Sequence, residues 1–179
     1  MLEEHAKLMT VLHEAGEVVG RKKLQKMIFI AQKLNFPFYE KYDFHYYGPY
    51  SEEVTLKIEE LANLGLVVEV QEKVNGYVQY RYSLSEAGER FLTNFHVDFP
   101  SLRECVQMMN KENARFLELV STIFYFDEFS KDEIIRKVEA VKAKQQYTIE
   151  EFEDAFAFIE QLKKLSIHAP DRSAPVCKA

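Results

Sequence analysis

The stretch from residue 18 to residue 66 constrains the fold most, because two amphipathic helical patterns there flank a segment rich in aromatic side chains. The first pattern repeats its apolar residues at i, i+3, i+4, i+7 and i+10, as one face of a helix requires. These residues are Leu24, Met27, Ile28, Ala31 and Leu34. The spacing predicts a helix that packs one side against a core.

The opposite side of this helix carries three lysines around a phenylalanine. At about 100° per residue, Lys22, Lys26 and Lys33 fall together, with Phe29 among them. Phe29 could be covered by another part of the same chain while the lysine stems reach water beside it. It could also be covered by a bound partner. The second interpretation makes this face a candidate partner-binding site.

Eight aromatic residues lie between positions 36 and 50, interrupted by Pro37 and by Gly48-Pro49. The prolines and the glycine predict extended or looped chain, and the alternation over 42–46 predicts a short strand. Tyrosine combines a large apolar body with a polar tip, which suits a recognition surface or the edge of a small core. Tyr46 and Tyr47 therefore join Lys22, Lys26, Phe29 and Lys33 as candidate partner-binding residues.

A second amphipathic helix follows Ser51, which is placed to cap it, and Gly65 closes it. Its buried stripe is predicted to be Val54, Ile58, Leu61 and Leu64. Its outward side is predicted to be Glu52, Leu56, Glu59, Glu60 and Asn63. This second helix therefore presents an acidic outer face.

The chain of 179 residues is 47% hydrophobic, which is enough for a real core, and its net charge is −6. No half of the chain is basic, which argues mildly against nucleic acid. The apolar runs are far shorter than the roughly 20 residues that span a bilayer, and no signal-peptide pattern begins the chain. Only Cys105 and Cys177 are present. This cysteine usage is typical of a reducing compartment, so we expect a cytoplasmic protein with no membrane association.

Outside the central stretch, the first half shows three further elements. Residues 2–15 form an amphipathic helical pattern. Two runs rich in β-branched and aromatic residues, 66–73 and 77–84, are joined across Asn75-Gly76, a strong hairpin signal. Ser85 then caps a predicted short helix over 86–94.

The second half reads as helical. Three S/T-x-x-E capping boxes mark helix starts, each before an apolar-periodic run; they are Ser101 with Glu104, Ser130 with Glu133, and Thr148 with Glu151. The three apolar stripes either close a small bundle, pack on the first half, or form a homodimer. A frayed tail is expected from residue 166.

These patterns predict an α+β, mainly α fold. Its N-terminal half is winged helix-turn-helix-like with a small antiparallel hairpin, and its C-terminal half is helical. The predicted divisions are 1–96 for the winged-helix-like domain, 97–165 for the helical region and 166–179 for a flexible tail. In this arrangement the helix before the hairpin occupies the recognition position.

The motifs GRKKLQKMIFIAQKL and FHYYGPYSEEV, with the ending YSLSEAG of the hairpin, resemble the YwgA family of bacterial proteins over nearly the whole chain. More distantly, the KLQK helix and the GP turn resemble the SocA-like, or Panacea, antitoxin domain over residues 18–66. The first resemblance implies a fold and no activity. The second implies a winged-helix-like core that binds protein partners such as toxins or acts as an adapter for proteolysis.

No pattern of an enzyme is present: HExxH, CxxC, GxSxG, a phosphate-binding loop and GxGxxG are all absent from the sequence, and two scattered cysteines make no zinc site. A lone His45 between Phe44 and Tyr46 is more typical of a hydrogen-bonded structural residue than of a base. We therefore expect no catalytic residues, no metal and no cofactor.

Two binding functions remain. A winged-helix DNA-binding regulator is the alternative, but a recognition helix normally offers basic or amide side chains to the bases, and here it offers glutamates. A protein-interaction or regulatory module uses the same acidic face, the basic face and the tyrosines without that penalty. The sequence favours a non-enzymatic protein-binding module.

Overall fold

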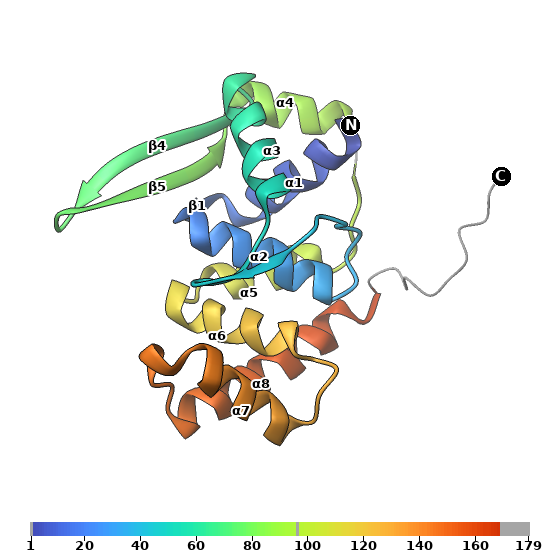
Figure 1. The fold of residues 1–179 in the computed structure, drawn as a ribbon. Coiled ribbons are helices and arrows are strands. Elements are labelled where there is room, and N and C mark those ends of the chain that lie inside the picture. Colours follow the sequence, from blue (N-terminus) through green and yellow to red (C-terminus); the bar gives the residue numbers. More distant parts are fainter. Residues whose placement is uncertain (1, 96, 169–179) are drawn as a thin grey trace.

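The computed structural model describes residues 2–95 and 97–168 (Figure 1). Helices dominate it beside a small antiparallel sheet, so the predicted α+β, mainly α class is confirmed. The helices are α1 (Leu2–Ala15), α2 (Arg21–Lys33), α3 (Glu52–Asn63), α4 (Glu86–Asn94), α5 (Leu102–Asn110), α6 (Ala114–Tyr125), α7 (Lys131–Val141) and α8 (Ile149–Leu165), with 3-10 turns η1 (Ala143–Gln145) and η2 (Ser166–His168). The strands are β1 (Glu17–Val19), β2 (Asp43–His45), β3 (Gly48–Tyr50), β4 (Val67–Val74) and β5 (Tyr77–Leu84).

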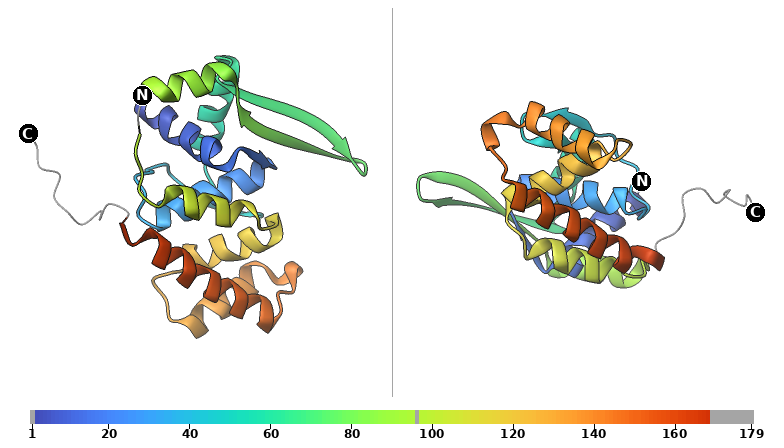
Figure 2. Two further views of the ribbon diagram at one scale, coloured as in Figure 1. Left: turned by 180° about the vertical axis from the view of Figure 1, so that it is seen from behind. Right: turned by 90° about the horizontal axis from the view of Figure 1, so that it is seen from below.

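The main sheet has three antiparallel strands in the order β1-β5-β4. Tyr82 of the central strand lies opposite Val18 of β1 and Glu69 of β4. The long hairpin turns at Asn75-Gly76, as predicted, and both turn residues have positive φ. Figure 2 shows this hairpin projecting far from the helical body. The element order is compatible with a winged helix, and that finer assignment stays a prediction.

Helix α2 lies at the centre of the molecule. It packs on α5 and α6 from the second half of the chain and on β1, β3 and β5 from the first (Figure 1). Every residue from position 24 to position 31 is buried. The side of this helix opposite the predicted apolar stripe is therefore covered between these positions by other parts of the same chain. Periodicity identifies the apolar stripe, and it does not show that distant helices cover the other side.

The end of α3 and the start of α4 are locked together. The Ser85 Oγ accepts a hydrogen bond from the Gly88 N–H at 3.0 Å, as the predicted cap requires, and donates one to the Gly65 carbonyl at 2.6 Å. The backbone of α4 then approaches the α3–β4 turn so closely that a Cβ at Gly88 would lie 2.2 Å from the Leu66 carbonyl oxygen. Only glycine fits this contact.

The second half departs from the expected helix starts in two ways. Ser101 has φ of 68° and makes no capping hydrogen bond, so the predicted box with Glu104 is wrong, whereas the boxes at Ser130 and Thr148 are confirmed. The first apolar run also divides into two helices. Asn113 caps the second of them, and its Oδ1 accepts from the Phe116 N–H at 2.8 Å.

The apolar stripes of the second half are covered within the chain. Helix α6 packs on α2, and α7 and α8 pack on α6. Their buried residues join those of α1 and α2 in one continuous core cluster. Val141 of the second predicted stripe stays exposed, and a homodimer through the C-terminal helices stays a prediction. The predicted boundary at His96 and residues 169–179 of the predicted tail lie outside the described residues, while Ser166–His168 form η2.

Candidate partner-binding site

Phe29 is covered by its own chain. Its side chain is 3% exposed. Its ring meets the edge of Tyr42 with centroids 4.9 Å apart, and the Tyr125 ring of α6 lies 6.5 Å away. The first of the two interpretations of this residue therefore describes the structure. A partner could not reach Phe29 without opening the core.

Lys26 is buried as well, with 2% of its surface exposed. Its Nζ donates a hydrogen bond to the Pro49 carbonyl at 2.8 Å. Burial lowers the pKa of Lys26 to about 8, and the nearby Glu118 carboxylate partly opposes that effect. The prediction of an exposed Lys26 is wrong, because the lysine satisfies a buried carbonyl instead of facing solvent.

A second buried lysine completes this arrangement. The Lys142 Nζ, just after α7, donates to the Tyr46 carbonyl and lies 2.6 Å from Glu118 Oε1. Gly48, with φ of 86°, fits between these groups, and a Cβ there would lie 3.4 Å from the Thr122 Oγ1. The β2–β3 turn is thus fastened to α2, α6 and α7. No local pattern marks Glu118 or Lys142, so neither residue can be identified from the sequence alone.

These contacts of the β2–β3 turn determine which candidate residues stay accessible. Tyr46 is 74% exposed. Tyr47 is partly exposed, and the Lys22 Nζ lies 4.5 Å from its ring centroid. Lys33 lies at the other end of α2, where its Nζ pairs with Asp127 at 3.3 Å. Of the six predicted residues, the structure brings Lys22 and Tyr47 together at one surface, whereas the Tyr46 ring lies beside Lys142 and Lys144. Lys26 and Phe29 are buried, and Lys33 lies at the other end of α2.

A groove of about 530 Å³ opens beside Lys22. It lies between the start of α2, the β2–β3 turn and the outer part of β5, and we call it the basic–tyrosine groove. Its charged and aromatic lining residues are Arg21, Lys22, Lys23, Tyr47, Tyr50 and Tyr80. Periodicity alone does not find Arg21 or Lys23, although the RKK run in the sequence is a visible signal.

The cations of this groove differ in how far they are neutralised. The Arg21 guanidinium lies 4.6 Å from the Tyr80 ring centroid and donates to the Tyr82 hydroxyl at 2.9 Å and to Glu69 at 3.2 Å. The hydrogen bond to Tyr82 raises the pKa of Arg21. The Lys23 Nζ donates to the Asn110 carbonyl, and burial lowers its pKa. Lys22 has no ion pair with any residue of the described chain.

Helix α2 reinforces the positive character of the groove. Its first turn holds no acidic side chain, and its N-cap, Gly20, supplies no capping side chain. The positive end of the helix dipole is therefore not offset there. A surface with this charge and these rings can accept a carboxylate-rich, partly aromatic segment through ion pairs and ring contacts.

Comparison with known proteins assigns the chain to a family. It is 58% identical over 165 residues to "Uncharacterized protein YwgA" of Bacillus subtilis (strain 168), and the aligned part covers 92% of this chain and 99% of that protein. The chain belongs to the YwgA family. No family model matches it. The relative's name states no activity, so a proposal about function has to rest on the geometry of the site.

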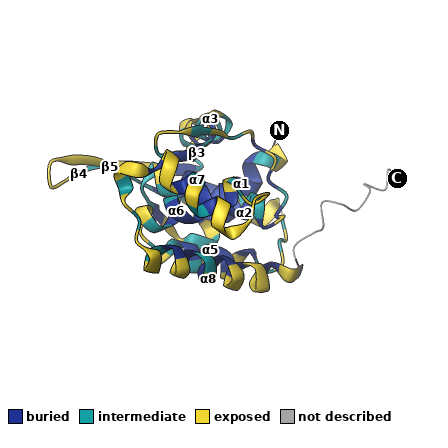
Figure 3. Ribbon diagram, turned by 60° about the horizontal axis from the view of Figure 1, so that its bottom comes forward, coloured by how far each residue is buried: buried dark blue, intermediate teal, exposed yellow. Residues whose placement is uncertain are grey.

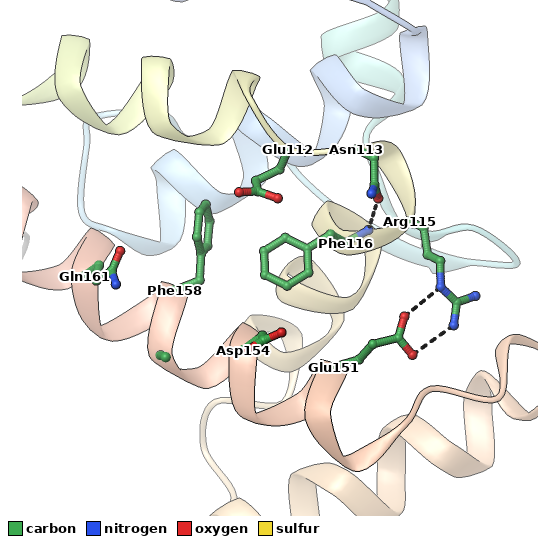
Figure 4. Close-up of a pocket in the computed structure, with 9 residues that line it drawn as sticks. Glu112, Asn113, Arg115, Phe116, Glu151, Asp154, Phe158 and Gln161 are labelled. Atoms are coloured by element: carbon green, nitrogen blue, oxygen red, sulfur yellow. Dashed lines mark hydrogen bonds and ion pairs between the residues drawn. The ribbon is translucent and has the colours of Figure 1, made fainter.

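A second hollow has the opposite charge. Figure 4 shows it between the α5–α6 connection and α8, with a volume of about 460 Å³. The rings of Phe116 and Phe158 meet edge to face 5.2 Å apart beside the carboxylates of Glu112 and Asp154. The Arg115 guanidinium closes one end through its pair with Glu151 at 2.8 Å.

The α3 surface is acidic, as predicted. All five residues expected on its outer face are exposed. The Glu60 Oε2 lies at hydrogen-bonding distance, 2.7 Å, from the His5 Nε2. The five outer-face residues include no lysine or arginine. On the neighbouring hairpin, Arg81 is paired with Glu72 at 2.7 Å and with Glu17 at 2.6 Å. In a winged helix, α3 and this hairpin would contact DNA; here the outer face of α3 is acidic, and the hairpin carries charges of both signs.

The remaining reactive groups are few. His45 is exposed on β2, and its ring lies 5.1 Å from that of Tyr50. Burial raises the pKa of the Cys105 thiol to about 12, so this cysteine stays protonated at neutral pH; Cys177 lies outside the described residues. Within residues 2–95 and 97–168, no three His, Cys, Asp or Glu side chains are grouped as metal ligands. Across the same ranges, no helix is both long and apolar enough to cross a bilayer.

Proposed function

We propose that this YwgA-family protein is a non-enzymatic, cytoplasmic protein-interaction module that binds an acidic segment of a protein partner in the basic–tyrosine groove. The observation that carries the proposal is the Lys22–Tyr47 pair, in which the exposed Lys22 ammonium, which has no ion pair within the described residues, lies 4.5 Å from the partly exposed Tyr47 ring. The Arg21–Tyr80 stack extends the same chemistry along the groove. Interfaces concentrate binding energy in tyrosine and arginine of this kind.

The chemistry of the groove favours an acidic partner segment. Charged groups of opposite sign across an interface raise the rate of association and exclude wrong partners. The protein carries a net charge of −6, so a basic groove on it directs an acidic segment to one place and repels that segment elsewhere.

The scaffold supports the proposal in two ways. The order of α1, β1, α2, α3 and the β4–β5 hairpin, with β5 between β1 and β4, is compatible with a winged-helix-like core. The acidic outer face of α3 then opposes duplex DNA, which is the alternative function. The distant resemblance to the SocA-like domain extends the proposal to an antitoxin-like or adapter-like role, in which this core binds a toxin or a protease substrate.

The test is affinity purification from the native host with tagged wild type and two variants. Lys22→Glu reverses the charge of the groove, and Lys164→Glu reverses an exposed lysine of α8, far along the chain from the groove. A protein that binds the groove should be recovered with wild type and with Lys164→Glu and should be lost with Lys22→Glu. The recovered protein is then purified, and its affinity for each variant is measured by calorimetry.

We expect Lys22→Glu to weaken that binding by roughly tenfold or more, as loss of a charge pair at an interface does, and added salt should weaken it further. Tyr47→Ala should weaken binding as well. Equal affinity of all variants for every recovered partner would refute the groove as the binding site. Recovery of nucleic acid in place of protein would favour the DNA-binding alternative.

A further inference from the structure

Strand β4 leaves one long edge of the main sheet unpaired. Among the described residues, β4 pairs with β5 alone in the order β1-β5-β4, and eight residues from Val67 to Val74 pair with β5 without a bulge. All of them after Val67 are exposed or partly exposed. Figure 3 shows the hairpin standing away from the buried body over most of its length.

This edge carries three charged residues, Glu69, Glu72 and Lys73, but it lacks the other features that usually prevent strand addition. Edge strands are normally short, bulged, covered, or interrupted by proline. The sequence VVEVQEKV has no proline and no glycine, and it includes the exposed valines Val68, Val70 and Val74. A two-stranded hairpin that projects into water is also only marginally stable by itself. A third strand on this edge would stabilise it.

The backbone hydrogen bonds at the ends of this sheet show which peptide groups face the open edge. The Ser85 N–H donates to the Leu66 carbonyl, and the Tyr80 carbonyl accepts from the Gly20 N–H and so points away from β4. Hydrogen-bonded and non-hydrogen-bonded residue pairs alternate along an antiparallel ladder. Gln71 lies opposite Tyr80, whose carbonyl points away from β4. The Gln71 N–H and C=O therefore point away from β5, toward the open edge. The same alternation directs the peptide groups of Val67, Glu69 and Lys73 outward.

We propose that the β4 edge is a self-association surface, where β4 of a second copy adds antiparallel across a twofold axis at Gln71. Three registers near the middle of β4, centred on Val70, Gln71 or Glu72, let the outward-facing peptide groups of the two copies form hydrogen bonds with each other. With Gln71 facing itself, Glu69 of each copy faces Lys73 of the other, and Val68 faces Val74. A register centred on Val70 places Val68 opposite Glu72, and one centred on Glu72 sets like charges face to face. Only the Gln71 register pairs opposite charges directly across the strands.

The projection of the hairpin makes this pairing sterically accessible, since most of β4 lies away from the helical body in both views of Figure 2. The interface is small, because it consists mainly of two strands and their flanking side chains. It belongs with weak, concentration-dependent associations. The inference does not rest on the proposed partner groove, and either can fail without the other.

The test exchanges the charges that face one another. Lys73→Glu gives two facing pairs of glutamates, and Glu69→Lys gives two facing pairs of lysines. Each single variant should weaken self-association roughly tenfold, because two pairs change from attraction to repulsion. A mixture of the two single variants restores both opposite-charge pairs in a heterodimer. The double variant Glu69→Lys/Lys73→Glu restores them in a homodimer.

Sedimentation velocity over a concentration series measures each outcome, and circular dichroism checks folding. The fold check matters for Glu69→Lys, since Glu69 also pairs with Arg21 within the chain. A second measurement avoids charge altogether. Gln71→Cys, in a Cys177→Ser background, should form an intermolecular disulfide under mild oxidation, because self-facing residues of a bonded pair have Cα atoms about 5.5 Å apart.

Val70→Cys in the same background is the matched control, because Val70 faces Glu72 in the proposed register and should not crosslink. Support for the proposal requires wild-type self-association that each single variant weakens, and that the mixture and the double variant recover. A wild type that stays monomeric at every concentration would overturn the proposal. So would a dimer that the single variants leave unchanged, or one that crosslinks through Val70→Cys and not through Gln71→Cys.

Discussion

Replacing Phe29 with alanine tests whether α2 is covered from within. The ring is 3% exposed and lies against Tyr42 and Tyr125, so the substitution leaves a cavity in the core between the two halves of the chain. Phenylalanine-to-alanine changes in cores cost about 3–5 kcal/mol of the free energy of unfolding. The edge-to-face contact with Tyr42 accounts for about 0.5–1.5 kcal/mol of that cost.

Urea denaturation followed by circular dichroism measures this loss. With an m-value of about 2 kcal/mol per molar urea, a loss of 3–5 kcal/mol lowers the transition midpoint by about 1.5–2.5 M. Tyr46→Ala is the matched control, because it removes a neighbouring aromatic ring that is 74% exposed. The control should change the free energy of unfolding by less than about 0.5 kcal/mol.

The result that refutes this reasoning is a Phe29→Ala protein that unfolds within about 1 kcal/mol of wild type at an unchanged m-value. Phe29 would then gain little from its intramolecular neighbours. A double-mutant cycle with Tyr125→Leu adds a check on the mechanism. The two residues should show a coupling free energy, because Tyr125 of α6 is part of the cover over Phe29.

Three further outcomes are expected. Gly88→Ala should destabilise the fold by about 1–3 kcal/mol, as overpacking does, since its Cβ would lie 2.2 Å from the Leu66 oxygen; a thermal melt that matches wild type would contradict the close approach. The pKa of Lys26 is about 8 in the folded protein, against 10.5 as its ordinary value. Between these two pH values the unfolded chain binds more protons than the folded chain, so the free energy of unfolding should rise with pH. Denaturation at several pH values should show that Lys26→Met removes this rise. Gel shifts at physiological salt should show at most weak, salt-sensitive, sequence-independent binding to duplex DNA, and a tight footprinted site would contradict the role assigned to the acidic α3 face.

The elements that the sequence predicted best are those with local chemical causes. Ser51, Ser85, Ser130 and Thr148 each accept the backbone hydrogen bond expected of an N-cap. The hairpin turns at Asn75-Gly76 because these residues readily adopt positive φ. Each of these features depends on a few consecutive residues, so a single sequence is sufficient to identify it.

Three-residue strands and unusual helix starts were harder to predict. Strand β2 lies within the short strand predicted over 42–46. Strands β1 and β3 exist because distant or adjoining strands pair with them, and their own three residues show too little alternation to signal a strand. Ser101 has the residue types of a capping box, but its left-handed backbone directs the side chain away from the first turn. The asparagine cap at Asn113 lies inside a stretch whose apolar spacing continues across the break.

The candidate site shows the same limit most clearly. Lys26 and Lys22 are one helical turn apart and share a side of α2, so helical periodicity treats them alike. The structure separates them, because the β2–β3 hairpin, held by Glu118 and Lys142 from much later in the chain, covers Lys26 and leaves Lys22 exposed beside the Tyr47 ring. A buried lysine is tolerated where a carbonyl and a carboxylate compensate it. The accessible binding surface is therefore set by the position of that hairpin, which charge patterning along α2 cannot reveal.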